Sequence, residues 1–178
     1  MKRKEELNAM KGRKITQEEA IRFFDSLEIA PKELLYGKWK GSELSTGHPM
    51  EGLLTASKWH GKQFIDDENV HPLVFDRSNG AQFLVNPGML PMNLPVNKFP
   101  KKLIGTAIKL FRPLIKTKKS RARLRMVEYR GKVSASMVYD QVGIIDVFRK
   151  VDDNTIFGAM DIKAYPDKRI YFFILERE

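Results

Sequence analysis

The sequence of 178 residues contains no cysteine, which excludes disulfides, thiolate chemistry and cysteine-based metal sites. It also lacks the GxSxG nucleophile elbow, the phosphate-binding loop and the dinucleotide-binding fingerprint. No apolar run approaches the length of a transmembrane helix, and residues 1–14 carry no apolar core of a secretory signal. We therefore expect a cytoplasmic protein, and no motif decides whether it is an enzyme.

Acidic residues are missing from one long basic stretch. Between Lys98 and Arg125 the sequence has eleven Lys and Arg residues and no Asp or Glu. Residues 1–14 add six basic and two acidic residues, so these two stretches supply the net charge of +10. Such a face attracts an anionic ligand or surface, although it also serves as an ordinary solvated face. Aromatic residues for base stacking are few there, so nucleic acid is not an expected partner.

Two segments have the periodicity of amphipathic helices. In the first, residues 16–29, Thr16 is the expected N-cap and Glu19 has the capping-box spacing. In the second, residues 101–115, apolar residues share one side, and Pro113 is expected to end or kink the helix near residues 109–112. With 42% hydrophobic residues, we expect one folded domain over residues 15–178, preceded by a basic flexible tail at residues 1–14.

From Arg121 onward the apolar period changes to two, as in β-strands. Turn-forming residues at 130–132, 152–154 and 165–168 divide this region into an antiparallel meander of five strands. Earlier strands are predicted at residues 34–44, 70–75 and 81–85, whereas 50–64 is ambiguous and the proline-rich segment 86–100 is a loop. Together these make about eight strands, enough to close a barrel with a small interior.

The segment Gly37–Gly41 reads GKWKG, and TGHPMEGLL, WHGKQF, VHPLVF, RARLRMVEYRGKVSASMVYD and IIDVFRKVDDNTIFGAMD follow in order. This set resembles the GXWXG family with its C-terminal domain of unknown function. The resemblance covers about residues 15–178, with the GXWXG part at about 15–95 and the C-terminal meander at about 118–178.

The resemblance implies a lipocalin-like barrel and no established activity. It implies structural roles for Gly37, Trp39 and Gly41, with Trp39 closing one end of the barrel under a cation–π contact from Arg177. The expected fold class is therefore mainly β (α+β): an antiparallel lipocalin-like β-barrel with an N-terminal helix and one amphipathic helix before the C-terminal meander.

Polar residues interrupt the apolar pattern of the meander, notably Asp146 and Asp161. A buried carboxylate without a partner costs several kcal/mol, so these acids should be paired, solvated or functional. Facing inward, they would make a polar pocket suited to a ligand with a carboxylate or phenol; facing outward, they would form surface pairs of small value. The candidate ligand-binding residues are His48, His60, Lys62, Arg123, Arg125 and Tyr139.

None of the three histidines has metal-site spacing, so we predict no metal site and no cofactor; haem ligation is the remaining alternative. His71 precedes Pro72, which favours extended backbone, and its ring could point into a cavity. Asp146 or Asp161 could then orient His71 as a general base. The candidate catalytic residues are His71, Asp146 and Asp161, and a structural hydrogen-bonding role is the alternative for each histidine.

Three functions fit these patterns. The first is a binding or carrier protein for a small amphipathic or anionic molecule in the barrel. The second is a cofactor-independent isomerase, lyase or hydrolase that uses acid and base residues in the same cavity. The third is peripheral attachment to an anionic membrane surface through residues 101–119 (Lys101 to Lys119).

Overall fold

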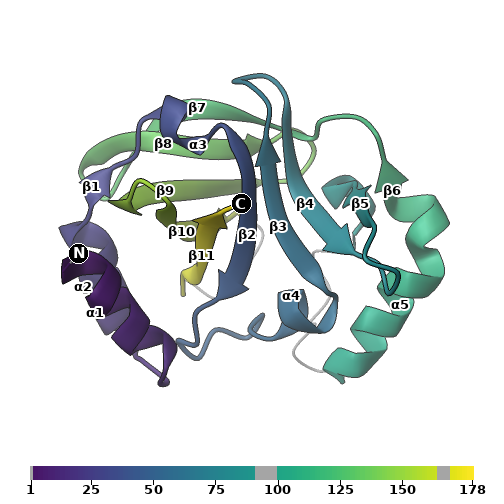
Figure 1. Ribbon diagram of the computed structural model, residues 1–178, viewed down its shortest axis with the longest axis horizontal. Coiled ribbons are helices and arrows are strands. Elements are labelled where there is room, and N and C mark those ends of the chain that lie inside the picture. Colours follow the sequence, from purple (N-terminus) through teal and green to yellow (C-terminus); the bar gives the residue numbers. More distant parts are fainter. Residues whose placement is uncertain (1, 91–99, 164–168) are drawn as a thin grey trace.

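The computed structural model describes residues 2–90, 100–163 and 169–178. An 8-stranded antiparallel β-barrel forms its centre, and strands that follow one another along the chain pair with one another around the wall (Figure 1). These strands are β2 (Gly37–Glu43), β3 (Trp59–Phe64), β4 (Val70–Asp76), β7 (Ala122–Tyr129), β8 (Lys132–Tyr139), β9 (Ile144–Asp152), β10 (Thr155–Ile162) and β11 (Tyr171–Arg177). The barrel closes because β11 pairs with β2. The prediction of an antiparallel barrel is confirmed.

Short strands extend the wall. β5 (Gln82–Val85) pairs with β4 and carries β6 (Lys116–Thr117), while β1 (Glu28–Ile29) pairs with β9. The β4–β7 contact is the weakest seam of the barrel, since its register consists of the pair Val70 and Ala122. The turn expected at 165–168, and residues 91–99 of the expected loop, lie outside the described residues.

The chain begins with helices α1 (Lys2–Lys11) and α2 (Gln17–Ser26). Thr16 and Glu19 form the expected capping box at the start of α2. The expectation of a flexible tail at residues 1–14 is wrong, because α1 buries Leu7 and Met10 against the same apolar cluster as α2. Two buried side chains one helical turn apart hold α1 in place, although most residues of this helix are charged and give little apolar periodicity.

Strands β9, β10 and β11 are apolar on both faces. Their inward side chains join the barrel core, which includes Phe148, Ile156, Phe173 and Leu175. Their outward side chains form a second core with α1 and α2, which includes Phe23, Phe24, Val147, Phe157, Phe172 and Ile174. The N-terminal helices therefore cover the outside of this part of the barrel.

Helix α5 (Lys101–Ile115) matches the predicted amphipathic helix. Pro113 does not end it near residues 109–112; the helix continues to Ile115, because a proline in the last turn removes only one of the final hydrogen bonds. Short helices α3 (Lys32–Leu35) and α4 (Leu53–Ala56) and the 3₁₀ turn η1 (Pro87–Met89) complete the description. The strand expected from residue 34 thus begins at Gly37, after α3. No helix among the described residues has the length and apolar character needed to cross a bilayer.

The GKWKG segment explains how one end of the barrel closes. Trp39 is fully buried, and its indole Nε1 donates to the backbone oxygen of Leu35 at 2.6 Å. The guanidinium of Arg177 lies 4.3 Å from the Trp39 ring centroid, which is the contact implied by the family resemblance. Gly37 has φ 117°, and a Cβ at Gly41 would lie 2.1 Å from the Trp59 ring, so neither position accepts a side chain without movement.

Candidate ligand-binding cavity

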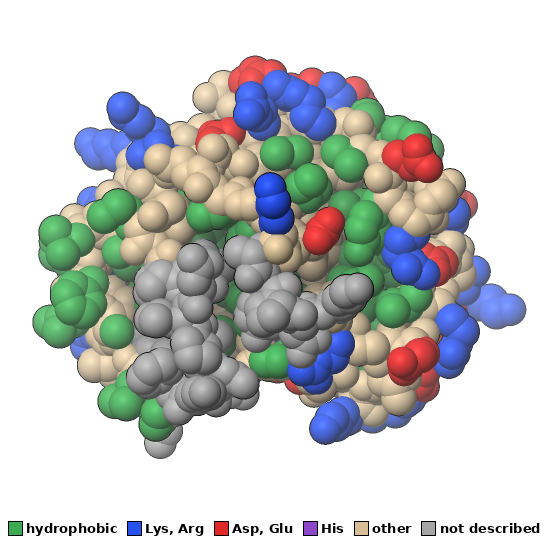
Figure 2. All heavy atoms as spheres, turned by 180° about the vertical axis from the view of Figure 1, so that it is seen from behind, with side chains coloured by type: hydrophobic (Ala, Val, Ile, Leu, Met, Phe, Trp, Pro, Cys, Tyr) green, Lys and Arg blue, Asp and Glu red, His purple; other side chains and the backbone are tan. Residues whose placement is uncertain are grey.

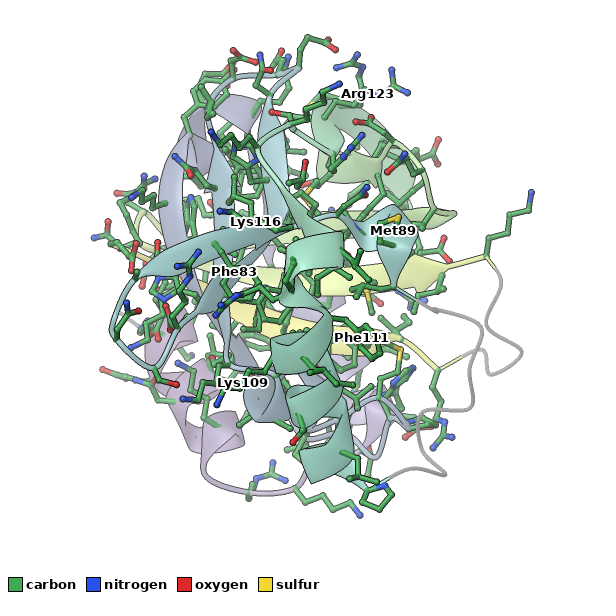
Figure 3. All side chains as sticks on the ribbon, turned by 90° about the vertical axis from the view of Figure 1, so that its right-hand side faces the viewer. Phe83, Met89, Lys109, Phe111, Lys116 and Arg123 are labelled. Carbon is green, nitrogen blue, oxygen red and sulfur yellow. The ribbon has the colours of Figure 1, made fainter. Side chains whose placement is uncertain are left out.

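The half of the barrel away from Trp39 is hollow. It encloses a cavity of about 460 Å³, within the range of small-molecule sites. The wall comes from the ends of the strands near α4, and helices α4 and α5 with η1 cover the mouth. In Figure 3, which faces α5, Phe111 and Met89 lie together on one side of this helix. Most of the lining is apolar: Met50, Leu53, Leu54, Trp59, Leu73, Phe75, Pro87, Met89, Leu90, Leu103, Ala107, Ile108, Phe111, Ile115, Ile144, Met160 and Phe173.

A small polar cluster lies inside this apolar wall. The Lys62 Nζ is 2.8 Å from Asp146 Oδ2, and both side chains are buried. The Tyr139 hydroxyl donates to the same Asp146 oxygen at 3.3 Å, and Lys62 also donates to the Pro72 carbonyl oxygen at 3.3 Å. Lys62, Tyr139 and Asp146 are called the polar cluster below.

The barrel topology brings this cluster together. Lys62 is on β3 and Asp146 on β9, which are opposite strands of the closed ring. Strand register aims Lys62 inward, because it pairs with the buried Trp39 on β2. Asp146 pairs with Met137 on one side and Met160 on the other, so its neighbours along the wall are apolar. The ion pair therefore spans the lumen and forms the floor of the cavity beside the tryptophan plug.

Aromatic rings surround the ammonium group. The Lys62 Nζ lies 5.0 Å from the Phe173 ring centroid, 5.5 Å from that of Trp59 and 5.7 Å from that of Tyr139. Ring faces attract a cation, and the attraction is larger where water is excluded. The rings therefore give the Lys62 side chain favourable contacts in a cavity that is otherwise apolar.

Burial dominates the electrostatics of the two acidic groups. It raises the pKa of the Asp146 carboxyl, against the lowering effect of the Lys62 charge and the hydrogen bonds from Lys62 and Tyr139. Burial and the nearby Asp146 charge also raise the pKa of the Tyr139 hydroxyl well above its usual value. Among the described residues, buried Asp146 Oδ1 and the buried indole Nε1 of Trp59 have no hydrogen-bond partner. Two buried residues that line the cavity thus have an acceptor and a donor with unused hydrogen-bonding capacity.

On the side formed by β11 and β2, hydrogen bonds link the cavity wall to helix α4. The Tyr171 hydroxyl donates to the carboxylate of Glu43. That carboxylate also accepts hydrogen bonds from the backbone N–H groups of Gly52 at 2.9 Å and Thr55 at 3.0 Å. Glu43 therefore anchors the first turn of α4, which lies at the mouth of the cavity.

Two of the three candidate catalytic residues lie away from the cavity. His71 is buried on β4 but faces away from it, since a register irregularity in the β3–β4 ladder between Gly61 and Gln63 changes the alternation before Leu73. Burial lowers the pKa of His71. Asp161 is exposed, because the preceding residue, Met160, is the one that points inward on β10. The expected acid–base group of His71, Asp146 and Asp161 therefore does not form in the cavity; only Asp146 lines it.

The expected ligand-binding residues divide in the same way. Lys62 and Tyr139 join Asp146, but His48 lies behind the wall, where its ring meets Tyr171 edge-on at 5.3 Å. His60 bridges two carboxylates, Asp76 at 3.0 Å and Glu178 at 2.6 Å.

The two arginines among the ligand-binding candidates are on the outer face of β7. Arg123 is 3.5 Å from Asp140, and Arg125 is 2.7 Å from Glu68. They point outward because Ala122 and Leu124 take the inward positions. The expectation of a polar-lined cavity is thus corrected to an apolar cavity with one polar cluster. Among the described residues, no group of three His, Asp or Glu side chains could hold a metal ion.

Sequence reasoning did not identify the apolar lining of the cavity. Trp59, Tyr171 and Phe173 contribute much of it, as do the helices at the mouth. One available signal was Gly41, since a glycine opposite a large aromatic residue allows that ring to lie flat against the strand.

A closed antiparallel barrel, plugged by a tryptophan at one end and hollow at the other, defines a lipocalin-like barrel protein, a class compatible with binding a small molecule. Within this class the chain belongs to the GXWXG family. The family model described as GXWXG protein matches residues 22–80, and the model described as Domain of unknown function (DUF4334) matches residues 120–177.

A solved structure supports the barrel fold. The crystal structure of a protein from Thermomonospora curvata is 30% identical in sequence to this chain. The match covers 100% of this chain and 99% of that protein, with a TM-score of 0.74. A comparison with curated proteins gives no match.

Proposed function

We propose that this protein binds a small, largely apolar molecule that carries one neutral hydrogen-bonding head group, such as a hydroxyl. The observation that carries the proposal is the cavity itself, which is apolar except for Ser57, the Tyr171 hydroxyl and the buried cluster of Lys62, Tyr139 and Asp146. Small-molecule sites commonly combine such a wall with a few polar groups that fix the orientation of the ligand.

The charge balance of the cluster favours a neutral head group. Lys62 and Asp146 already neutralise each other at 2.8 Å, so an anionic ligand would have to compete with Asp146 for the ammonium. A hydroxyl could instead donate to Asp146 Oδ1, the oxygen without a partner. This hydrogen bond is favourable, because a buried acceptor that makes no hydrogen bond costs about 1–3 kcal/mol.

The test uses three probes that share one ten-carbon alkyl chain: 1-decanol, decanoate and decane. The matched control is an apolar triple variant, Lys62→Met with Tyr139→Phe and Asp146→Leu, which removes the polar cluster and keeps an apolar floor. Affinities are measured by displacement of a fluorescent apolar dye from the purified protein. We expect the ratio of decanol affinity to decane affinity to be about tenfold larger in wild type than in the triple variant, as one buried hydrogen bond predicts. Equal preferences in both proteins would contradict the proposed head-group recognition, and no binding of any probe would contradict a ligand cavity.

A cofactor-independent enzyme is the second candidate. The observation in its favour is the Asp146 carboxyl, whose pKa is raised by burial and whose Oδ1 faces no protein donor among the described residues. Asp146 would act as the general base, and Tyr139 or Lys62 would stabilise the charge that develops on the substrate. Turnover of a bound probe by wild type, lost in Asp146→Asn while binding remains, would favour this function over simple binding.

A further inference from the structure

Helix α5 exposes large apolar side chains that a packed helix would bury. Leu103 is 58% exposed, Leu110 71%, Phe111 52% and Leu114 68%. Their spacing places them on one side of the helix. Met89 of η1, 54% exposed, adds to this surface, and Figure 2 shows hydrophobic side chains at the edge of the molecule where α5 lies. Scattered exposed apolar residues are ordinary, but four on one helix form a patch that needs an explanation.

A second side of α5 is basic. Lys109 points away from Phe111 and Met89 in Figure 3, and Lys116, at the end of the helix, lies on the side of Lys109. Lys118 and Lys119 follow the short strand β6 and are exposed. None of these four lysines pairs with a carboxylate among the residues that the structure describes, and the sequence has no acidic residue from 98 to 125. We call the four exposed apolar residues of α5 the apolar face and these four lysines the basic side.

The apolar face continues into the cavity. Leu103 and Phe111 are more than half exposed and also line the cavity, while Ile108 and Ile115 of the same helix line it from the inner side. A partner that covers the apolar face would therefore also contact the mouth of the cavity.

We propose that α5 docks this protein on an anionic lipid surface, with the apolar face inserted at the interface and the basic side facing the lipid head groups. Amphipathic helices with this composition lie in the plane of the interface. Anionic lipids attract each nearby lysine, which makes the binding sensitive to salt. The source of the ligand follows if the proposed ligand-binding function holds. The ligand is an amphiphile dissolved in the bilayer, and it enters the cavity between α5, α4 and η1.

A lipid surface fits this region better than a second copy of the chain. A two-fold dimer would bury the apolar face against its own copy but would leave the basic side without an anionic partner. An anionic bilayer engages both, because its interface accepts the apolar face and its head groups neutralise the lysines.

The test measures co-sedimentation of the full chain with vesicles of pure phosphatidylcholine or of phosphatidylcholine with about 30% phosphatidylglycerol. L110S/L114S removes half of the apolar face, and its matched control is M126S/V133S, at exposed apolar residues on β7 and β8. The triple change K116Q/K118Q/K119Q removes charge from the basic side, and its control is K38Q/K40Q/K58Q, at lysines exposed elsewhere.

We expect wild type to bind the anionic vesicles and to be released by salt. L110S/L114S should lower the partition coefficient at least tenfold, and the triple change should lower it by about a hundredfold, since each lysine contributes about tenfold or less. Both controls should bind as wild type does. Equal binding of wild type and L110S/L114S would overturn the proposal, as would equal binding to both kinds of vesicle.

Two further measurements separate the alternatives. A molar mass that doubles with concentration in wild type but not in L110S/L114S, without vesicle binding, would assign the face to a dimer and overturn the proposal. Probe affinity measured in the absence of vesicles tests the cavity alone. Vesicle binding without probe binding would therefore reject the proposed ligand function and leave membrane docking standing, and probe binding without vesicle binding would do the reverse.

Discussion

Replacing Lys62 by methionine removes the partner of a fully buried carboxylate. At 2.8 Å and an effective dielectric constant of about 20, the attraction between Lys62 and Asp146 amounts to about 6 kcal/mol. The cost of removing both charges from water offsets much of this, but breaking a buried pair from one side still typically costs about 3–5 kcal/mol. We expect Lys62→Met to lower the free energy of unfolding by that amount near neutral pH. The apolar triple variant, which also removes Asp146 and the Tyr139 hydroxyl, should be close to wild type.

Urea unfolding followed by tryptophan fluorescence measures these differences, and its pH dependence provides a second check. Burial already raises the pKa of Asp146, and without Lys62 the pKa should rise further. Between the unfolded and folded pKa values the folded state then binds more protons, so stability falls as pH rises. The difference in the free energy of unfolding between wild type and Lys62→Met should therefore shrink as the pH is lowered from about 8 to about 5.

Two results would refute this reasoning. A loss below about 1 kcal/mol in Lys62→Met would mean that the pair behaves as an exposed one. A triple variant less stable than the single variant would mean that the polar cluster, rather than the unpaired charge, holds the barrel together.

Two further predictions concern residues outside the polar cluster. Arg177→Gln should lower the free energy of unfolding by about 2 kcal/mol and shift the emission of Trp39, because the cation over its ring and the hydrogen bonds to Tyr36 and Leu34 are lost; unchanged unfolding would count against a structural plug. Burial lowers the pKa of His71, so the unfolded state takes up a proton first and stability should fall as the pH drops below about 6.5; His71→Gln should flatten this part of the stability profile, and an unaltered profile would contradict the burial effect.

Much of the fold was accessible from the sequence because local signals and barrel topology agree. Thr16 and Glu19 mark the start of α2, and the period-two pattern after Arg121 marks the meander. Helix α1 was missed because its mainly charged residues 2–6 hide two apolar anchors, and these matter only once β9–β11 supply a surface to bury them.

The site was predictable only in part. Asp146 stood out as an acid inside an apolar strand, and its partner had to be charged or polar. Nothing local identifies Lys62 as that partner, because Lys62 on β3 and Asp146 on β9 lie on opposite sides of the ring and meet only when the barrel closes. His71 was misplaced by a strand irregularity, since one extra residue in a ladder reverses which side chains face inward.

The position of β11 between β10 and β2 has a consequence for how the chain is made. Tyr171 reaches Glu43 across 128 positions, so the first barrel strands wait for their neighbour until β11 has left the ribosome. During that interval the β11-facing edge of β2 is unpaired, and the phenylalanines of α2 lack much of their apolar surface, including Phe172. Contacts of such long range form slowly, and open strand edges invite aggregation. Docking of β11 is therefore the step at which folding of this protein should depend most on chaperones.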